Sequence, residues 1–412
     1  MKSQDITRTA SVAEIRAAFP ALSRMHGGKS VAYFDGPGGT QVPRQVVAAM
    51  SDYLLEHNAN THWAYPTSEE TDALIASSRA TMADFLNCSS DEVAFGLNMT
   101  TLTFHVARAL GWLWGKGDEI IVTDLDHHAN IAPWKVLERE RGVTVRSVPF
   151  NIENGELRMS ELARLLTPRT RLVAIGAASN ALGTVNDLEE IMMMVRGVDA
   201  LAYVDAVHAA PHILPDVREL DCDFLACSAY KFHGPHIGVM YARRDIANNL
   251  DIPRLDPAPA EMPERIETGT GNHEGMAGAA AAVDFLADLS SGDSRRSRLQ
   301  QTFAALHARG QKLVERMWSG LQRIDGVTLY GPAPDRPRTP TIAFNVRGKS
   351  AEHVARQLSQ SGLFVSHGDF YAATVIEKLG VAPEGVVRAG AACYTNEDDV
   401  ERLVDGVRRL AT

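Results

Sequence analysis

The stretch that decides the fold is FLACSAYK, residues 224–231, an apolar run that ends in Lys231. A second apolar run, LAYVD at residues 201–205, precedes it and ends in Asp205. Both runs are short and do not alternate with polar residues, which is typical of strands buried on both faces of a parallel sheet. Because ligands of such sheets lie beyond the carboxyl ends of the strands, we expect the amine and the carboxylate to share one site.

Short apolar runs alternate with helical periodicity over residues 70–245, which predicts a mainly parallel sheet with helices on both faces. The expected strands are 93–97, 119–124, 143–149, 171–177, 201–205, 224–231 and 238–242, and the expected helices are 71–86, 102–114, 131–141 and 188–195. After a long helix at 295–322, the remainder indicates a smaller C-terminal α+β domain. We therefore expect an N-terminal segment (1–30) that packs with the small domain, a large domain (31–290) and a small domain (291–412).

The bulk properties exclude several classes of function. The chain has 412 residues and a net charge of −10, without a lysine or arginine run that could follow a phosphate backbone, so nucleic acid is not an expected partner. No apolar stretch reaches the length of a membrane helix, and the polar N-terminus lacks a signal-peptide core, so we expect a cytoplasmic protein. The scattered cysteines are expected to be free buried thiols rather than metal ligands; they are Cys88, Cys222, Cys227 and Cys393.

An amine and a carboxylate at the ends of neighbouring strands suit pyridoxal phosphate. Lys231 could form a Schiff base with the aldehyde of that cofactor, and Asp205 could pair with its pyridinium nitrogen. Taken alone the pair is a weak signal, because most lysines that follow a strand are solvated. The residues after the other expected strands therefore carry the argument.

The segment NMTT, residues 98–101, joins one of these strands to a helix. The N–H groups of a helix N-terminus, here at Asn98, Met99 and Thr100, are a natural phosphate cradle, and Ser228 could add a donor. A plain N-cap by one of the two threonines is the alternative.

Three further side chains have suitable chemistry. His127, in DHHAN at 126–130, could lie over an aromatic cofactor, with an N-cap cluster or a metal site as alternatives. Asn180 could hydrogen-bond the phenolic oxygen of the cofactor or the substrate, or serve only as a turn residue. Arg388 stands alone in an apolar strand and suits a substrate carboxylate, although a structural salt bridge competes.

From Tyr33 to Tyr394 the chain resembles the class V aminotransferase group of fold-type I pyridoxal phosphate enzymes, and within it the cysteine desulfurase-like branch. The most specific stretches are DHHANIAPW at 126–134, SNALGT at 179–184 and DCDFLACSAYK at 221–231. The resemblance implies the α/β fold of that group, with a mainly parallel central sheet and a smaller C-terminal domain. It also implies a homodimer with shared active sites, in which Thr270 reaches the phosphate of the neighbouring subunit.

The resemblance implies a role for each matched residue. Together with the residues above, the candidate catalytic residues are Lys231, His127, Asp205 and Tyr371; the candidate cofactor-binding residues are Asn98, Met99, Thr100, His127, Asn180, Asp205, His208, Ser228, Tyr230, Lys231 and Thr270; and the candidate substrate-binding residues are Asn180, Arg388 and His62. No metal ligand is implied.

The chain departs from the desulfurase pattern at several positions. Related desulfurases carry a cysteine that accepts sulfur as a persulfide, whereas Tyr371 stands at that position and Ser366 at the arginine of the same loop. His208 replaces a glutamine, as in isopenicillin N epimerase and kynureninase, and Tyr230 replaces a histidine. These changes leave cofactor binding intact and disfavour persulfide chemistry.

We therefore expect a pyridoxal phosphate-dependent transferase or lyase that acts at Cα or Cβ of a small amino-acid substrate, by transamination, C–S or β-elimination, or epimerisation. Lys231 would move the Cα proton, and Tyr371 could supply a second acid. The alternatives are a true cysteine desulfurase that uses another thiol, and a catalytically inactive cofactor-binding scaffold or regulatory protein. The sequence does not identify the substrate.

Overall fold

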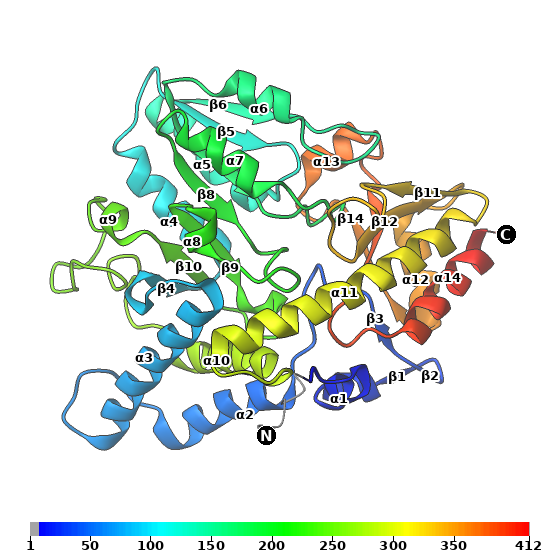
Figure 1. Ribbon diagram of the computed structural model, residues 1–412, viewed down its shortest axis with the longest axis horizontal. Helices are drawn as coiled ribbons and strands as arrows, with labels where there is room; N and C mark the ends of the chain where they lie inside the picture. Colours follow the sequence, from blue (N-terminus) through cyan, green and yellow to red (C-terminus); the bar gives the residue numbers. More distant parts are fainter. Residues whose placement is uncertain (1–7, 412) are drawn as a thin grey trace, which may run out of the picture.

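The computed structural model describes residues 8–411, and its larger part is built on a seven-stranded sheet (Figure 1). In spatial order the strands are β4 (Val93–Gly96), β10 (Gly238–Ala242), β9 (Phe224–Ser228), β8 (Leu201–Asp205), β7 (Thr170–Gly176), β5 (Glu119–Thr123) and β6 (Thr144–Val148). β10 is antiparallel to both of its neighbours, β4 and β9. The remaining neighbouring pairs, β9–β8, β8–β7, β7–β5 and β5–β6, are parallel. The predicted mainly parallel sheet is confirmed.

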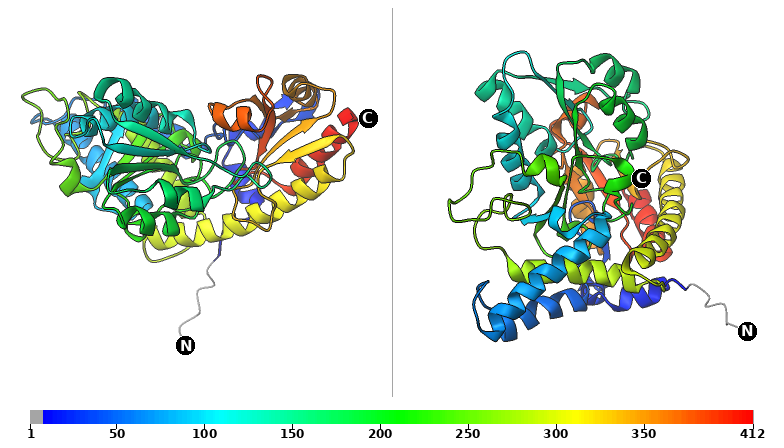
Figure 2. Two further views of the ribbon diagram at one scale, coloured as in Figure 1. Left: turned by 90° about the horizontal axis from the view of Figure 1, so that it is seen from above. Right: turned by 60° about the vertical axis from the view of Figure 1, so that its left-hand side comes forward.

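Helices cover both faces of this sheet (Figures 1 and 2). One core lies under α4 (Met99–Gly111) and α5 (Ala132–Arg141). The other core lies under α3 (Pro66–Leu86), α6 (Met159–Leu165), α7 (Leu188–Arg196) and α10 (His273–Asp288). Within β9, Phe224 and Ala226 belong to the first core, and Leu225 and Cys227 belong to the second. Because both faces are buried, the strand has no polar alternation.

The smaller part is a four-stranded antiparallel sheet with helices packed against it. Its strands, in order, are β11 (Val327–Tyr330), β12 (Thr341–Val346), β15 (Val386–Gly390) and β14 (Ser366–Gly368). The helices of this part are α12 (Ala351–Gln360), α13 (Ala373–Lys378) and α14 (Glu397–Ala411). The expected α+β character of the C-terminal region is therefore confirmed.

A single long helix, α11 (Arg295–Gln322), joins the two parts (Figure 2). Its first turns bury Leu299 and Phe303 in the core of the large sheet. Its last turns bury Leu313 and Met317 in the core of the small sheet. Because one continuous helix contributes to both cores, it holds the two sheets in a defined relative position.

The N-terminal region contacts both parts. In α1 (Val12–Ala17), Ile15 belongs to the core of the large sheet, whereas Arg16 forms an ion pair of 2.8 Å with Asp399 in α14. Strand β3 (Ala32–Tyr33) pairs in parallel with β13 (Leu363–Phe364) of the small part. Residues 1–7 of the predicted N-terminal segment lie outside the described residues. The division into 1–30, 31–290 and 291–412 remains a proposal.

The remaining elements are short or lie at the edge of the large part. They are β1 (Met25–His26), β2 (Lys29–Ser30), α2 (Arg44–Asp52), α8 (Val217–Leu220) and α9 (Arg244–Ala247).

The turn after β9 differs from the expected strand. β9 ends at Ser228, and residues 229–231 form a 3-10 turn, so Lys231 lies three residues beyond the strand rather than at its end. The chain must reverse here, because β10 runs antiparallel to β9. The backbone N–H of Thr40 donates to the carbonyl of Tyr230 at 3.0 Å and fixes this turn against the N-terminal loop.

Candidate active site

A cavity of about 950 Å³ lies where the carboxyl ends of the parallel strands meet the small part of the molecule. Most of the predicted site residues line it: Asn98, Met99, Thr100, His127, Asn180, Asp205, His208, Ser228, Tyr230, Lys231, Tyr371 and Arg388. The tertiary structure thus brings together residues from seven separate segments of the chain. A volume of this size is in the range of cavities that bind small ligands and cofactors.

Lys231 is the amine of this cavity and is 8% exposed. Its Nζ donates hydrogen bonds to the carbonyl of Pro37 and, at 3.1 Å, to that of Gly38. Burial and the charge of Arg388 together lower the pKa of Lys231 to about 7, against the opposing effect of Asp205. A large share of this amine is therefore neutral near pH 7, and only the neutral form is a nucleophile or a base.

Asp205 ends β8 and lies beside Gly176 of β7 in the sheet register. Its Oδ1 accepts a hydrogen bond of 2.9 Å from the N–H of Val207. Burial raises the pKa of Asp205 to about 6, against the hydrogen bond from Val207 and the charge of Lys231. The carboxylate is still mainly ionised at pH 7, and a cationic nitrogen placed beside it would stabilise the ionised form further.

The N-terminus of α4 opens into the same cavity. Asn98 is its N-cap, because the side-chain oxygen accepts from the N–H of Thr101 at 2.9 Å. The alternative of a cap by one of the two threonines is therefore wrong, because Asn98, which precedes them, caps the helix. The N–H of Met99 donates to Oγ of Ser228 at 3.1 Å, which places the serine at the helix end. A helix N-terminus with a hydroxyl beside it suits a phosphate group.

His127 is the N-cap of a 3-10 turn, His128–Asn130, which follows β5. Its Nδ1 accepts a hydrogen bond of 3.0 Å from the N–H of Ala129, so the ring caps this turn and also lines the cavity. Burial lowers the pKa of His127 to about 4, helped by the positive charge of Lys231. The imidazole is neutral near pH 7, with its proton on Nε2. His127 can therefore cap this turn and also lie over an aromatic ligand in the cavity.

Arg388 lies in β15 and is only 3% exposed. Its Nη1 donates to the carbonyl of Asn180 at 2.9 Å, and its Nε has no partner. Among residues 8–411 no carboxylate forms an ion pair with it, so the structural salt bridge weighed against the substrate role is absent from this part of the chain. Burial lowers the pKa of Arg388 to about 9. The charge of Asp35 raises this pKa, but Asp35 forms no ion pair with Arg388, so the guanidinium lacks the directly bonded anion that buried cations ordinarily have.

Asn180 connects the two parts of the molecule at the cavity. Its Nδ2 donates to the carbonyl of Phe370 at 2.9 Å, so one amide hydrogen is already used by the protein. Its Oδ1 is buried without a partner. His208 makes a second connection, because its Nε2 lies 3.0 Å from Oγ1 of Thr339 and 3.3 Å from Oγ1 of Thr341 in the small part.

Two predicted residues lie outside this cavity. His62 is exposed, and its Nδ1 pairs with a carboxylate oxygen of Asp72 at 3.1 Å. Thr270 lines a neighbouring pocket of about 220 Å³ together with His105 and Glu267. Within one chain, neither residue reaches the other predicted site residues.

The cavity also has lining residues that were not predicted. Asp126 immediately precedes His127, and its Oδ1 accepts from the N–H of Gly176 at 2.9 Å. Burial raises the pKa of Asp126 to about 7. Phe370 and His236 also line the cavity. Asp126 belongs to the DHHAN segment at residues 126–130, but sequence spacing alone does not distinguish a buried structural carboxylate from a functional one.

The thiols lie elsewhere, and none of the four cysteines lines the cavity. Cys222 and Cys227 are buried, and Cys88 and Cys393 are partly buried. Burial raises the pKa of Cys222 and of Cys393 to about 12, and it also raises the pKa of the other two. Thiols with raised pKa values are poor nucleophiles.

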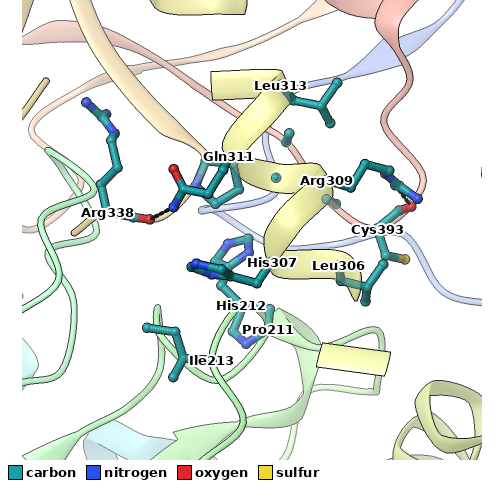
Figure 3. Close-up of a pocket in the computed structure, with 14 residues that line it drawn as sticks. Pro211, His212, Ile213, Leu306, His307, Arg309, Gln311, Leu313, Arg338 and Cys393 are labelled. Carbon is teal, nitrogen blue, oxygen red and sulfur yellow. Dashed lines mark hydrogen bonds between the residues drawn. The ribbon is translucent and has the colours of Figure 1, made fainter. Parts of the chain in front are cut away.

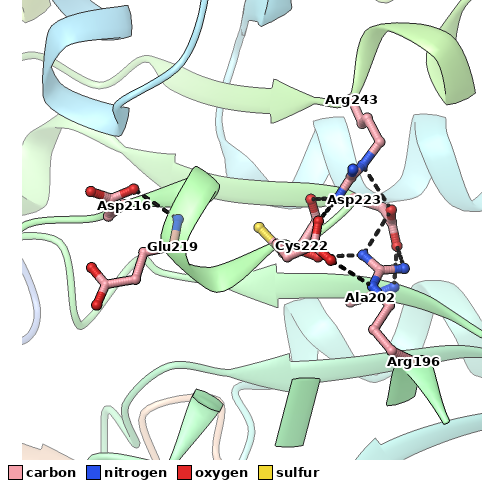
Figure 4. Close-up of polar contacts among 8 residues, drawn as sticks. Arg196, Ala202, Asp216, Glu219, Cys222, Asp223 and Arg243 are labelled. Atoms are coloured by element: carbon pink, nitrogen blue, oxygen red, sulfur yellow. Dashed lines mark hydrogen bonds and ion pairs between the residues drawn. The ribbon is translucent and has the colours of Figure 1, made fainter. Parts of the chain in front are cut away.

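Two other features lie outside this cavity, an ion-pair cluster and a small cleft. Figure 4 shows Asp223 between Arg196 and Arg243, at the ends of β8, β9 and β10 opposite Asp205. Figure 3 shows a small cleft between His212 and α11, with a volume of about 30 Å³, which is room for about one water molecule. Within residues 8–411 there is no metal-like group of His, Cys, Asp and Glu, and no helix combines the length and apolarity needed to span a membrane.

The cavity residues fit pyridoxal phosphate. The volume is sufficient, a buried amine and a buried carboxylate both line the cavity, and a helix N-terminus supplies phosphate donors. The side chains of Asn180 and Arg388 each leave a buried polar atom without a partner, as expected where a polar ligand completes the site.

Comparison with known proteins agrees with this geometry. The model of the family described as aminotransferase class-V matches residues 32–403. The cysteine desulfurase of Pectobacterium carotovorum is 32% identical over 97% of this chain and 98% of its own, and a probable cysteine desulfurase of Halalkalibacterium halodurans is 30% identical over 96% and 97%. Among solved structures, the apo cysteine desulfurase from Thermococcus onnurineus NA1 superposes with a TM-score of 0.88 at 28% identity, covering 97% of this chain and 98% of its own. The cysteine desulfurase CsdA from Escherichia coli superposes with a TM-score of 0.84 at 26% identity, with the same coverage.

Proposed function

The chain belongs to the class V aminotransferase family and is a pyridoxal phosphate-dependent enzyme, and we propose that it cleaves or moves bonds at Cα and Cβ of a small amino acid without forming a protein persulfide. The observation that supports this most directly is the composition of the cavity. It brings together Lys231, Asp205 and Arg388, and it contains no thiol.

Each residue has a defined part in the proposed reaction. When bound, pyridoxal phosphate supplies an aldehyde that captures the substrate amine and a ring that stabilises negative charge at Cα. The ionised carboxylate of Asp205 would keep the ring nitrogen protonated, and the N-terminus of α4 with Ser228 would hold the phosphate. His127 would lie over the ring and exclude water from that face.

Lys231 has the properties of the proton carrier. Its pKa of about 7 allows Nζ to accept the Cα proton and to return it near neutral pH. Arg388 would hold the substrate carboxylate and thereby point the Cα proton toward Nζ. The phenol of Tyr371, which is 73% exposed at the cavity rim, would donate a proton to a leaving group on the other side.

Desulfuration through another thiol has less support. A persulfide acceptor must reach the substrate sulfur, and the four cysteines lie outside the cavity with raised pKa values. Elimination that releases free sulfide does not need a thiol and stays within the proposed function. An inactive scaffold also has less support, because selection for binding alone would not need an amine with its pKa near 7.

We also propose a homodimer in which the partner chain completes the site. His62 and Thr270 lie outside the cavity of their own chain. Large apolar side chains close to them in sequence or in space are exposed, among them Leu55, Trp63 and Leu97. Exposed apolar groups of this kind are typical of an interface between subunits. The four free cysteines suit a reducing compartment, so we propose the cytoplasm as the location.

A screen of amino acids against the purified holoenzyme tests the function. The visible absorption of the bound cofactor should change with a responsive amino acid, and mass spectrometry should identify the product. Lys231→Ala should abolish the visible band of the lysine-bound cofactor, and a band that persists in this variant would contradict the assignment of the amine. Rapid formation of a protein persulfide from L-cysteine would contradict the thiol-free mechanism.

A further inference from the structure

The guanidinium of Arg388 has an unusual aromatic neighbour. Its central carbon lies 3.9 Å from the centre of the Phe370 ring, which is the distance of a close cation–π contact. Arg388 makes one hydrogen bond, to the carbonyl of Asn180, and its Nε has no partner. One face of the cation is therefore covered by the ring, and part of its donor edge remains available to a ligand.

The backbone that carries the ring is strained. Phe370 and Tyr371 both have φ of 56°, a left-handed conformation that side chains other than glycine rarely adopt. Two bonds from the large part hold it in place: Nδ2 of Asn180 donates to the carbonyl of Phe370 at 2.9 Å, and the N–H of His128 donates to the carbonyl of Tyr371 at 2.8 Å. Such strain persists only where the surroundings impose it, and it concentrates at functional sites.

We propose that Phe370 is a specificity-determining residue, which positions Arg388 to select ligands that carry a carboxylate next to the amine. This rests on the proposed function. The ring fixes the plane of the guanidinium and keeps water from one of its faces. The substrate carboxylate must then approach in that plane, along a donor edge that the bond to Asn180 leaves unused, where a fork-shaped pair of hydrogen bonds can form.

The position of the ring has a chemical consequence. A desolvated cation binds an anion more strongly than a hydrated one does, because the local dielectric is lower. Removing the ring while keeping an apolar side chain should therefore weaken the carboxylate contact and leave amine capture unchanged. A residue that served only to pack the loop would affect both in the same proportion.

The test compares two probes that capture the cofactor aldehyde through the same aminooxy nitrogen. Aminooxyacetate carries a carboxylate and methoxyamine does not. In each case the probe nitrogen forms the new C=N bond, Lys231 leaves as the free amine, and no oxidant or reductant is needed. The measured quantity is the rate at which each probe removes the visible band of the holoenzyme, and the ratio of the two rates reports carboxylate recognition.

For the wild-type protein we expect aminooxyacetate to react faster. Phe370→Leu should reduce the rate ratio about tenfold, as expected for the loss of a buried cation–π contact. Phe370→Tyr, which keeps an aromatic ring, should retain the wild-type rate ratio. The matched control is Phe364→Leu, the same change in β13 outside the cavity, which should leave the ratio unaltered. Arg388→Gln should remove the preference.

The outcomes separate this inference from the proposed function. An unchanged ratio in Phe370→Leu, with the preference lost in Arg388→Gln, would overturn the role of Phe370 and leave the carboxylate site intact. Equal rates for the two probes on the wild-type protein would overturn both the role of Phe370 and the carboxylate site at Arg388. If Phe370→Leu does not retain the cofactor, Phe370→Met is a second ring-free variant, and it should show the same loss of ratio.

Discussion

Gly238 packs directly against the backbone of Asn98, the residue that caps α4 at the end of the cavity where we propose that the phosphate binds. A Cβ on Gly238 would lie 2.5 Å from the carbonyl carbon of Asn98, closer than any real side chain can approach. We expect Gly238→Ala to push this helix end out of place. The overpacking should cost about 1–3 kcal/mol, which corresponds to roughly a five- to 100-fold loss of cofactor affinity when the strain falls on the bound state.

Titration of the apoprotein with pyridoxal phosphate measures that affinity. Gly115→Ala is the control, because a Cβ there would meet only the carbonyl of Arg141 at 3.9 Å. Equal cofactor affinity in the two variants would show that the contact between Gly238 and Asn98 does not shape the phosphate site.

The amine of Lys231 should control the pH dependence of cofactor capture. Its pKa of about 7 in the folded protein lies well below the ordinary value, because it is buried and near Arg388. Below that pH the amine is an ammonium ion without a free electron pair, so capture should be slow and should rise through about pH 7. The growth of the visible band after mixing apoprotein and cofactor measures this rate.

Arg388→Gln tests the cause of this shift. Loss of the neighbouring positive charge should raise the pKa of Lys231, so the rise in capture rate should move to higher pH. A midpoint near the value of an exposed lysine in the wild-type protein would contradict the desolvation of Nζ in the cavity.

Asp205→Asn separates cofactor binding from chemistry. The amide keeps the size of the side chain and can still accept from the N–H of Val207, but it cannot stabilise a protonated ring nitrogen. We expect the visible band to remain, since Lys231 still forms its bond, while turnover falls about 100- to 1000-fold, as for loss of one buried electrostatic contact. Steady-state kinetics with a responsive amino acid check this, and activity within about twofold of wild type would contradict the role of Asp205.

Asp223 should be essential to stability rather than to chemistry. It is buried, with 2% of its side chain exposed, and it contacts Arg196 and Arg243 at 3.1 Å each, as well as the N–H of Ala202 at 2.8 Å (Figure 4). Asp223→Asn would leave two guanidinium groups without their buried carboxylate, so the free energy of unfolding should fall by about 3–5 kcal/mol.

Asp221 provides a matched control for this prediction. It pairs with the same two arginines, but 58% of its side chain is exposed. Asp221→Asn should cost less than about 1 kcal/mol, because water screens the pair. Denaturant unfolding of both variants measures the difference, and similar losses would mean that burial does not distinguish the two carboxylates.

Much of the fold could be predicted because buried strands differ from helices in length and periodicity. The seven strands of the large sheet agree with the expected runs to within a few residues. The conformation around Lys231 was less accessible to prediction. The apolar run continues past Ser228, but the need to reverse into an antiparallel strand ends the extended conformation there. Partner strands impose that need, and a local pattern does not encode it.

The candidate site divides in the same way. Lys231, Asp205, His127 and Asn180 could be found because each lies at or shortly after the end of an apolar run, and the ends of neighbouring parallel strands lie together. Phe370 could not be found, because its contact with Arg388 depends on a left-handed backbone and on bonds from Asn180 and His128 across the two parts of the molecule. The position of His62 outside the cavity was equally beyond a single sequence, whereas the family resemblance already implied that Thr270 acts outside the cavity of its own chain.

By itself the sequence determined the chemical inventory: an amine, a carboxylate and an arginine on apolar strands, and a tyrosine where related enzymes have a cysteine. These are properties of residue type and order along the chain. Only the tertiary structure decided that the arginine forms no ion pair with a carboxylate of residues 8–411, that the amine is buried enough to lose its proton near pH 7, and that the cysteines lie away from the cavity. Burial and charge proximity arise from packing between segments far apart in sequence, so they appear only once those segments meet.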